Sequence, residues 1–208
     1  MAKPFIKWVG GKSQLIPEIT QRLPEYVKNG KPYIYVEPFS GSAAVALHLL
    51  DSGHPPSAII LNDINTDLVN LYKVVKSNPH ELLAYLKTLQ VEYDELEDKE
   101  AKQPYYYTKR EEFNTREADD IKHAGLFIFL NRAGFNGLYR VNSKNKFNVP
   151  IGSYKKPNFV FEDTILHASK ALANVEIYNQ SYEDTLSYLE QFNKTKLPAF
   201  FYFDPPYK

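Results

Sequence analysis

A repeated order of short apolar segments and amphipathic helices is the feature that most constrains this chain. Runs rich in β-branched and aromatic residues predict buried strands over residues 33–36, 58–61, 175–178 and 199–203. Helices are predicted over residues 42–50, 68–77, 79–96, 164–173 and 182–192. Strands that alternate with helices through short connections favour a parallel sheet, so the predicted fold class is α/β.

The alternation is interrupted between the second and third predicted strands. Residues 97–129 are charged and helical in pattern, and residues 135–150 predict a β-hairpin around the turn-rich segment 142–145. We therefore divide the chain into a sheet domain of residues 1–78 and 158–208 and an insertion of residues 79–157. Within the insertion, residues 131–157 carry six Lys or Arg and no Asp or Glu, although the whole chain has no net charge. Such a stretch is typical of a polyanion-binding surface, but a solvated basic loop explains the charge equally well.

Composition excludes several other classes of protein. The chain has 208 residues and no cysteine, which excludes disulfide scaffolds, thiolate zinc sites and cysteine nucleophiles. A hydrophobic content of 43% is too high for a disordered chain. No apolar run approaches the roughly 18 residues of a membrane span, and the N-terminus lacks a signal-peptide pattern. We therefore expect a cytoplasmic protein without a membrane partner.

Two glycine-containing segments suggest a ligand site. Residues 37–42 follow the first predicted strand and open a helix, and Asp63 ends the next strand about 20 residues after Gly41. A glycine turn followed by an acid at this distance suits a nucleoside, because the acid binds ribose hydroxyls, although an ordinary strand–helix turn fits as well. Residues 7–12 join a double-glycine turn to the charge of Lys12, and a simple N-terminal turn is the alternative there.

The most specific motif is the sequence Asp-Pro-Pro-Tyr at residues 204–207, directly after the last apolar strand. In open α/β sheets, ligands bind at the carboxyl ends of the strands. Two prolines hold a rigid turn, which presents the Asp204 carboxylate and the Pro205 carbonyl as paired acceptors for an amino group. Tyr207 is then placed to stack on the ring that carries this amino group. The alternative is a rigid solvent-exposed turn.

The motifs at 7–12, 37–41 and 204–207, together with segments 131–140 and 146–157, resemble the Dam-type (D12 class) family of DNA adenine methyltransferases. The resemblance covers essentially the whole chain. It implies a Rossmann-like class I methyltransferase sheet with an inserted helical and β-hairpin DNA-recognition domain. Ala43 departs from the family pattern, which usually has glycine at this position. We expect the alanine to tighten the cofactor loop slightly.

The resemblance also implies the cofactor and the chemistry. S-adenosyl-L-methionine is the implied methyl donor, without a metal. The residues implied to hold it are Trp8, Gly10, Gly11, Lys12, Glu37, Phe39, Gly41, Asp63 and Asp204. The implied catalytic residues are Asp204, Pro205, Pro206 and Tyr207. Hydrogen bonds from the adenine amino group to Asp204 and Pro205 favour the tetrahedral nitrogen that carries a free lone pair.

The implied partner is double-stranded DNA with the target sequence GATC, in which the target adenine leaves the base stack. Backbone contacts are expected from Arg132, Lys144, Lys146, Lys155 and Lys156, and Arg140 is the expected guanine reader. The remaining implied contacts are Lys7 and Tyr154 at the first base, Leu138 and Pro150 at the thymine methyl, and Phe135 and Asn136 beside the flipped position. Ser153 replaces an arginine common in the family, so one contact is expected to be lost.

Two other functions remain open on the sequence alone. A catalytically inactive or split-enzyme fragment would act as a DNA-binding module, and Gly41 with Asp63 would also suit a nicotinamide-dependent oxidoreductase. The family's sheet has more strands than are readable here, and we expect its C-terminal strands to be missing from residues 1–208. A fragment of this kind is expected to self-associate through the apolar edge at 199–203, or to pair with a separate C-terminal polypeptide.

Overall fold

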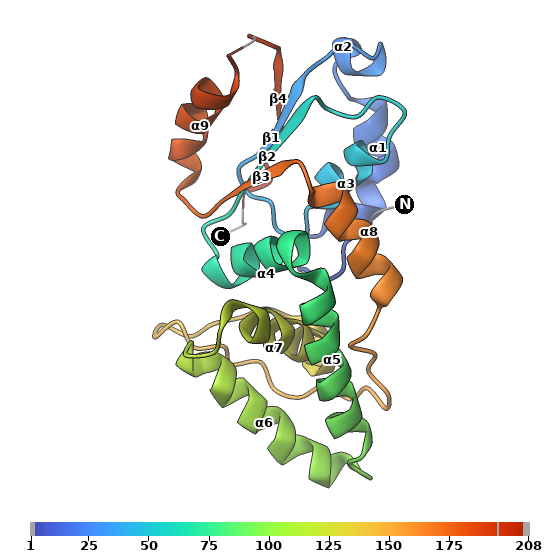
Figure 1. Ribbon diagram of the computed structural model, residues 1–208, viewed down its shortest axis with the longest axis vertical. Helices are drawn as coiled ribbons and strands as arrows, with labels where there is room; N and C mark the ends of the chain where they lie inside the picture. Colours follow the sequence, from blue (N-terminus) through green and yellow to red (C-terminus); the bar gives the residue numbers. More distant parts are fainter. Residues whose placement is uncertain (1–2, 195, 206–208) are drawn as a thin grey trace.

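The computed structural model describes residues 3–194 and 196–205 (Figure 1). The molecule is elongated, with a parallel sheet at one end and a helical lobe at the other. The sheet has four strands in the order β3-β2-β1-β4. Their bounds are β1 (Ile34–Glu37), β2 (Ala58–Asn62), β3 (Val175–Tyr178) and β4 (Ala199–Phe201). All pairings are parallel, so the predicted α/β class and the position of every predicted strand are confirmed.

The two faces of the sheet pack into different hydrophobic clusters. Ile34, Val36 and Ile60 pack in a small cluster with Leu189 of α9 (Thr185–Phe192), while Tyr35 belongs to the main core. This alternation follows from the two-residue period of a strand. At this end of the molecule, the main core receives side chains from α1 (Ile16–Gln21), α2 (Glu25–Lys28), α3 (Ala44–Leu50), α4 (Thr66–Ser77) and α8 (Glu162–Leu172). Short 3₁₀ turns lie at Lys12–Leu15 and Tyr182–Asp184.

The last predicted strand is shorter than expected. Regular pairing ends at Phe201, although the Tyr202 N–H still donates to the Val36 carbonyl at 2.9 Å. Phe203 then turns out of the sheet and is 58% exposed. Strand β4 lies at one edge of the described sheet, and self-association through it stays a prediction.

The helical lobe is built around a buried helix. Helix α7 (Asp120–Ala133) is buried continuously from His123 to Asn131 and packs against α4, α5 (Pro79–Asp94) and α6 (Lys99–Thr115). The predicted helical pattern over 97–129 is confirmed, but it forms two helices. Arg116 ends α6 in a left-handed conformation, with φ at 54°. Because α4 contacts both α7 and α8, it joins the lobe to the sheet.

The predicted hairpin at 135–150 is only partly correct. The chain turns back on itself, but a 3₁₀ turn (Phe135–Gly137) and isolated antiparallel bridges replace the regular strands. Side chains take the backbone bonds that a strand pair would use. Asn114 of α6 bonds both the N–H and the carbonyl of Phe147, at 2.7 and 3.1 Å. Asn142 accepts from the N–H groups of Lys144 and Lys146 within the turn.

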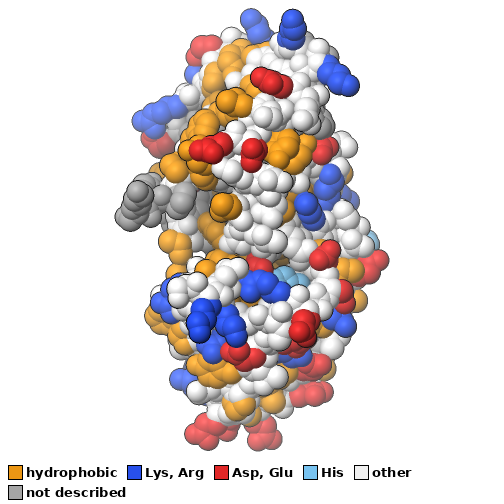
Figure 2. Space-filling model, turned by 90° about the vertical axis from the view of Figure 1, so that its left-hand side faces the viewer, with side chains coloured by type: hydrophobic (Ala, Val, Ile, Leu, Met, Phe, Trp, Pro, Cys, Tyr) orange, Lys and Arg blue, Asp and Glu red, His pale blue; other side chains and the backbone are white. Residues whose placement is uncertain are grey.

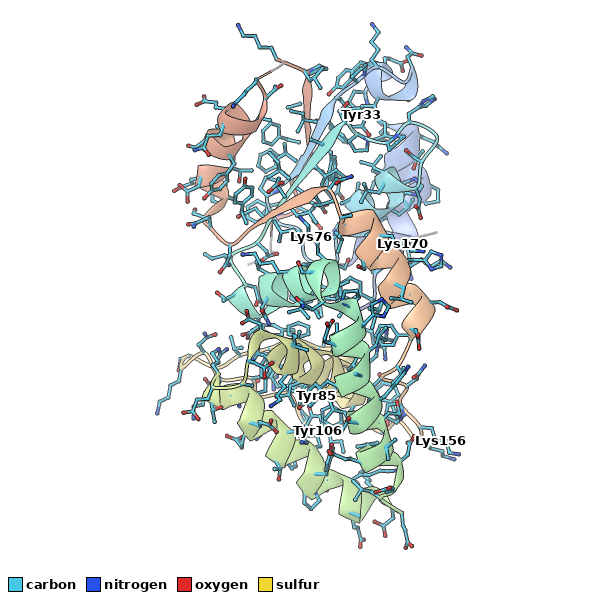
Figure 3. The ribbon with its side chains drawn as sticks, viewed as in Figure 1. Tyr33, Lys76, Tyr85, Tyr106, Lys156 and Lys170 are labelled. Carbon is cyan, nitrogen blue, oxygen red and sulfur yellow. The ribbon has the colours of Figure 1, made fainter. Side chains whose placement is uncertain are left out.

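Tyr106 anchors this loop from below. It lies inside the lobe (Figure 3), and its hydroxyl donates to the Val149 carbonyl at 3.0 Å.

The described helices include none that is both long and apolar enough to cross a membrane.

Candidate cofactor pocket and nucleic-acid interface

A pocket of about 470 Å³ lies at the carboxyl ends of the strands. Glu37 ends β1, and Asp63 and Asp204 follow β2 and β4, so the parallel order brings these acids to one edge of the sheet. The pocket collects every residue that the sequence implied for cofactor binding, from Trp8 through Asp204. Pro205 also lines it. Pro206 and Tyr207, two of the expected catalytic residues, lie outside the described residues.

The glycine turn forms one wall of the pocket. Gly41 has a φ of 46°, and a Cβ atom added there would lie 2.9 Å from the Trp8 Nε1 atom. The indole therefore packs directly on the backbone of this turn, which only glycine allows. Ala43, where the family usually has glycine, also has a left-handed conformation, with φ at 50°.

Asp63 is held rigidly by the backbone around it. One carboxylate oxygen accepts from the Gly41 N–H at 3.0 Å, and the other accepts from the Asn65 N–H at 2.9 Å. Burial raises the pKa of Asp63, and these two N–H groups offset part of the increase. Each oxygen keeps a second lone pair for a ligand. The geometry is compatible with the expected ribose contact, which stays a prediction.

Glu37 lies at the bottom of the same pocket and is 3% exposed. Burial raises its pKa from an ordinary value of 4.5 to about 8. Hydrogen bonds from the Tyr35 hydroxyl, at 3.0 Å, and from the Ala46 N–H lower the pKa, whereas the charges of Asp204 and Asp63 raise it further. The carboxylates thus repel one another across the pocket, and a cationic ligand would relieve this repulsion.

Lys12 joins the first motif to the last. Its ammonium group lies 2.5 Å from an oxygen of Asp204 and also donates to the Gly10 carbonyl at 2.7 Å. Asp204 keeps a quarter of its side chain exposed at the pocket. This ion pair leaves the second oxygen of Asp204 available to accept a hydrogen bond.

The sequence reasoning missed several residues of the pocket. Asn65 and Ile64 follow Asp63 directly, and Tyr139 reaches the pocket from the insertion. Tyr139 stands between two residues expected to contact DNA, and no local pattern distinguishes it from them. Its ring is stacked on that of Trp8, with the centroids 5.6 Å apart.

The residues expected to contact bases lie mostly on one exposed loop. Lys7 and Tyr154, expected near the same base, meet in the structure: the Lys7 ammonium donates to the Tyr154 hydroxyl at 3.0 Å. Phe135 is 48% exposed, and its N–H donates to the Pro150 carbonyl at 2.9 Å. The other members of this group are exposed Asn136 and half-buried Leu138. Arg140 is exposed and is oriented by its Nε–H, which donates to the Asn148 side chain at 2.7 Å.

Arg132, one of the expected phosphate contacts, is partly buried and has partners within the protein. Its guanidinium donates to the Phe5 carbonyl at 2.9 Å and lies 4.2 Å from the centre of the Phe161 ring. Burial lowers its pKa. In the last turn of α7, this side chain therefore joins the N-terminal segment to the residue before α8, and its contact with phosphate stays a prediction.

The remaining cations of the basic segment are exposed, namely Lys144, Lys146, Lys155 and Lys156. Figure 2 shows Lys and Arg side chains gathered just below the middle of one face, at the level where the loop after α7 projects in Figure 1. Lys156 lies at the opposite side of the lobe (Figure 3). The six cations thus do not form one compact patch. Among the described residues, no group of three His, Asp or Glu side chains is arranged to hold a metal.

A parallel sheet with an acidic pocket at its carboxyl edge and a glycine turn after β1 is consistent with the class I methyltransferase fold. Comparison with known proteins agrees with it. The sequence profile of the D12 class N6 adenine-specific DNA methyltransferases matches residues 8–208. The chain belongs to this family, which confirms the resemblance seen in its motifs.

Individual relatives are similar along almost the whole chain. It is 41% identical over 208 residues to the type II methyltransferase M.MjaIII of Methanocaldococcus jannaschii, covering 99% of this chain and 69% of that protein. It is 37% identical over 205 residues to the DNA adenine methylase of Escherichia coli, covering 99% of this chain and 65% of the relative. The chain thus spans about two thirds of the length of these relatives.

Proposed function

We propose that this chain binds S-adenosyl-L-methionine in the pocket and methylates the exocyclic amino group of adenine in duplex DNA, with GATC as the target. The observation that carries the proposal is that residues from both ends of the chain meet around one pocket of about 470 Å³. This volume is in the usual range for small-ligand sites. The names of the relatives support methylation of DNA adenine, and segments 131–140 and 146–157 support the target sequence.

The charge of the pocket suits this cofactor. Three carboxylates and one lysine line it, and the buried Glu37 is forced toward its neutral form. S-adenosyl-L-methionine carries a sulfonium and an ammonium group, and the carboxylates of the pocket stabilise their positive charge. Trp8, packed on Gly41, offers a flat apolar surface to the same ligand. When bound, S-adenosyl-L-methionine supplies an electrophilic methyl group, and its leaving group is a neutral thioether.

The chain's own residues prepare the nucleophile. The amino nitrogen of adenine is a poor nucleophile because its lone pair is delocalised into the ring. Asp204 and the Pro205 carbonyl accept hydrogen bonds from this amino group and so favour a tetrahedral nitrogen. Lys12 fixes the orientation of Asp204 through the 2.5 Å ion pair. The proton released after transfer passes to Asp204 or to water.

The loop after α7 recognises the DNA. The target adenine leaves the stack, since its amino group is unreachable inside a duplex. Arg140 reads guanine in the major groove, and the exposed lysines contact phosphates without sequence preference. Phe135 and Asn136, at the exposed turn that begins the loop, lie beside the base that leaves the stack.

Two assays on the native chain test this function. Calorimetry measures the binding of S-adenosyl-L-methionine, and radiolabelled methyl transfer compares a GATC duplex with a duplex in which one base pair of the site is changed. The proposal is supported if the chain binds S-adenosyl-L-methionine and transfers the methyl group to the GATC duplex but not to the altered duplex. Binding of a nicotinamide cofactor instead would favour the oxidoreductase alternative. DNA binding without transfer would favour the DNA-binding module.

A substitution of Asp63 sharpens the binding assay. Asp63→Ala removes a carboxylate that is held against the pocket, so affinity for the cofactor should fall by about 1–3 kcal/mol. Asp163→Ala is the matched control, because it removes an exposed acid at the start of α8. Equal affinities of the two variants would contradict the ribose contact.

A further inference from the structure

Tyr139 connects the DNA-recognition loop to the cofactor pocket. Its ring lies between two others: Trp8 on one side, at 5.6 Å with an interplanar angle of 27°, and Phe127 of α7, at 5.4 Å with an angle of 17°. Tyr139 also lines the pocket itself. The wall of the pocket formed by Trp8 is thus supported from behind by a residue of the loop.

Asp67 fixes the position of Tyr139. The Tyr139 hydroxyl donates to an oxygen of Asp67 at 2.6 Å, and Asp67 is 4% exposed in the first turn of α4. The same carboxylate binds Arg116 at 3.0 Å and lies 2.9 Å from His123 Nε2. Burial raises the pKa of Asp67, but these hydrogen bonds and the Arg116 charge outweigh it and hold the pKa below its usual value. Asp67 therefore stays charged and accepts strongly.

The backbone of Lys7, next to Trp8, is held by a residue of α7. The Asn131 side chain accepts from the Lys7 N–H at 2.9 Å and donates to the Lys7 carbonyl at 2.8 Å. On its other side, the indole packs on Gly41. Trp8, which stays partly exposed, therefore contacts both the glycine turn and Tyr139 of the loop.

We propose that Tyr139 and Asp67 are positioning residues for the cofactor. Asp67 orients the Tyr139 ring, Tyr139 holds the Trp8 ring as a wall of the pocket, and cofactor affinity depends on this stack. This inference rests on the proposed function and deepens it. Its consequence is that the loop carrying Leu138 and Arg140, which are expected to read DNA, also sets the shape of the cofactor site.

The chain contains one tryptophan, so its fluorescence reports on Trp8 alone. The test compares the native chain with Tyr139→Leu, Tyr139→Phe and Asp67→Asn. Each protein is measured without ligand by selective tryptophan excitation, then titrated with S-adenosyl-L-methionine in a calorimeter. Circular dichroism shows whether each variant is folded.

A matched control is available in the same lobe. The Tyr105 hydroxyl donates to Glu92 at 2.6 Å, which is the same kind of bond at the same length, but its ring packs on Tyr93 and Phe129. Tyr105→Phe therefore removes an equivalent hydrogen bond without touching Trp8. A general loss of stability would affect the Tyr105 and Tyr139 variants alike.

The expected result separates these variants. Tyr139→Leu should shift the Trp8 emission and weaken cofactor binding about tenfold, because the stacked ring is lost. Tyr139→Phe keeps the ring and should weaken binding less, as should Asp67→Asn. Tyr105→Phe should leave both measurements unchanged. If Tyr139→Leu gives the native emission and the native affinity, the proposal is wrong.

Two further outcomes are also decisive. If Tyr139→Leu does not fold, the comparison of Tyr139→Phe and Asp67→Asn with Tyr105→Phe decides, and equal cofactor affinities overturn the proposal. If the native chain does not bind S-adenosyl-L-methionine, the proposed function fails. The ligand-free emission spectra then still show whether Tyr139 positions Trp8.

Discussion

The cofactor pocket and the DNA-recognition loop are built on different physical principles. The acids of the pocket follow regular parallel strands, and Glu37 is 3% exposed. The loop after α7 has only isolated bridges, and its expected contact residues include Phe135 and Tyr154, which are 48% and 39% exposed. Three of the four charged residues that line the pocket are carboxylates, whereas the loop segment 131–157 contains only cations among its charged residues.

This difference indicates how each region tolerates change. Backbone bonds between strands fix the positions of the chain at Glu37, Asp63 and Asp204, so the grouping of these three acids depends little on individual side chains. Side-chain amides shape the loop, because Asn114 and Asn142 bond its backbone directly. Substitutions of these acids should therefore affect reaction on every DNA, and substitution of a base-reading residue of the loop should affect the choice of DNA.

The largest expected effect is on turnover in the pocket. In a catalytically complete form of the enzyme, Asp204→Ala should lower turnover about 10²–10⁴-fold, because the adenine amino group loses a positioned acceptor, while DNA affinity stays near native. Single-turnover methyl transfer and a DNA-binding titration measure the two quantities. Glu190→Ala, on the exposed surface of α9, is the control. Near-native turnover of Asp204→Ala would contradict the proposed chemistry.

The pocket should also show a characteristic dependence of stability on pH. The pKa of Glu37 is about 8 in the folded chain against an ordinary 4.5, so the folded state retains a proton that the unfolded state loses. This contribution is fully present below pH 4.5 and is lost as the pH rises through 8, with a slope of at most about 1.4 kcal/mol per pH unit.

Glu37→Gln should remove this dependence, since the amide cannot ionise and still accepts from Tyr35. Denaturant unfolding at several pH values between pH 5 and pH 9 measures how the unfolding free energy changes with pH. This range includes the pKa of about 8 in the folded chain. Glu190→Gln should behave like the native chain. If both variants have the native slope, Glu37 does not carry a raised pKa.

The loop is tested by comparing a base reader with a phosphate contact. Arg140→Ala should cost about 1–3 kcal/mol and relax the preference at one base pair. Lys155→Ala should weaken binding to all sequences equally and reduce the salt slope by about one. Binding titrations with GATC and altered duplexes at several salt concentrations separate these effects. The reverse pattern would exchange the two roles.

The smallest expected effect concerns the glycine turn. Ala43 has a left-handed backbone, which costs roughly 1–2 kcal/mol for a residue other than glycine. Ala43→Gly relieves this strain but removes a buried methyl group worth about 0.8 kcal/mol. The unfolding free energy should therefore change by less than about 1 kcal/mol. A large loss would show that the Ala43 methyl group is essential to the packing of α3.

Much of the fold and site was predictable from local patterns. The strands ending near Glu37, Asp63 and Asp204 are short apolar runs, and parallel pairing brings their ends together without further information. The hairpin predicted at 135–150 was only partly correct, because Asn114 of α6 takes the backbone bonds of Phe147. A count of charges also did not show that the Arg132 guanidinium is partly buried against the Phe5 carbonyl and the Phe161 ring.

The sequence by itself determined the alternation of strands and helices, the family and the residues that gather at the pocket. These depend on the period of apolar residues and on motifs that are contiguous in the chain. Only the tertiary structure decided that Tyr139 supports Trp8, that Asp67 holds Tyr139, and that Arg132 bonds the Phe5 carbonyl. Each of these contacts joins residues far apart in sequence. The packing of α7 against α4 and the N-terminal segment brings them together, and no local pattern encodes it.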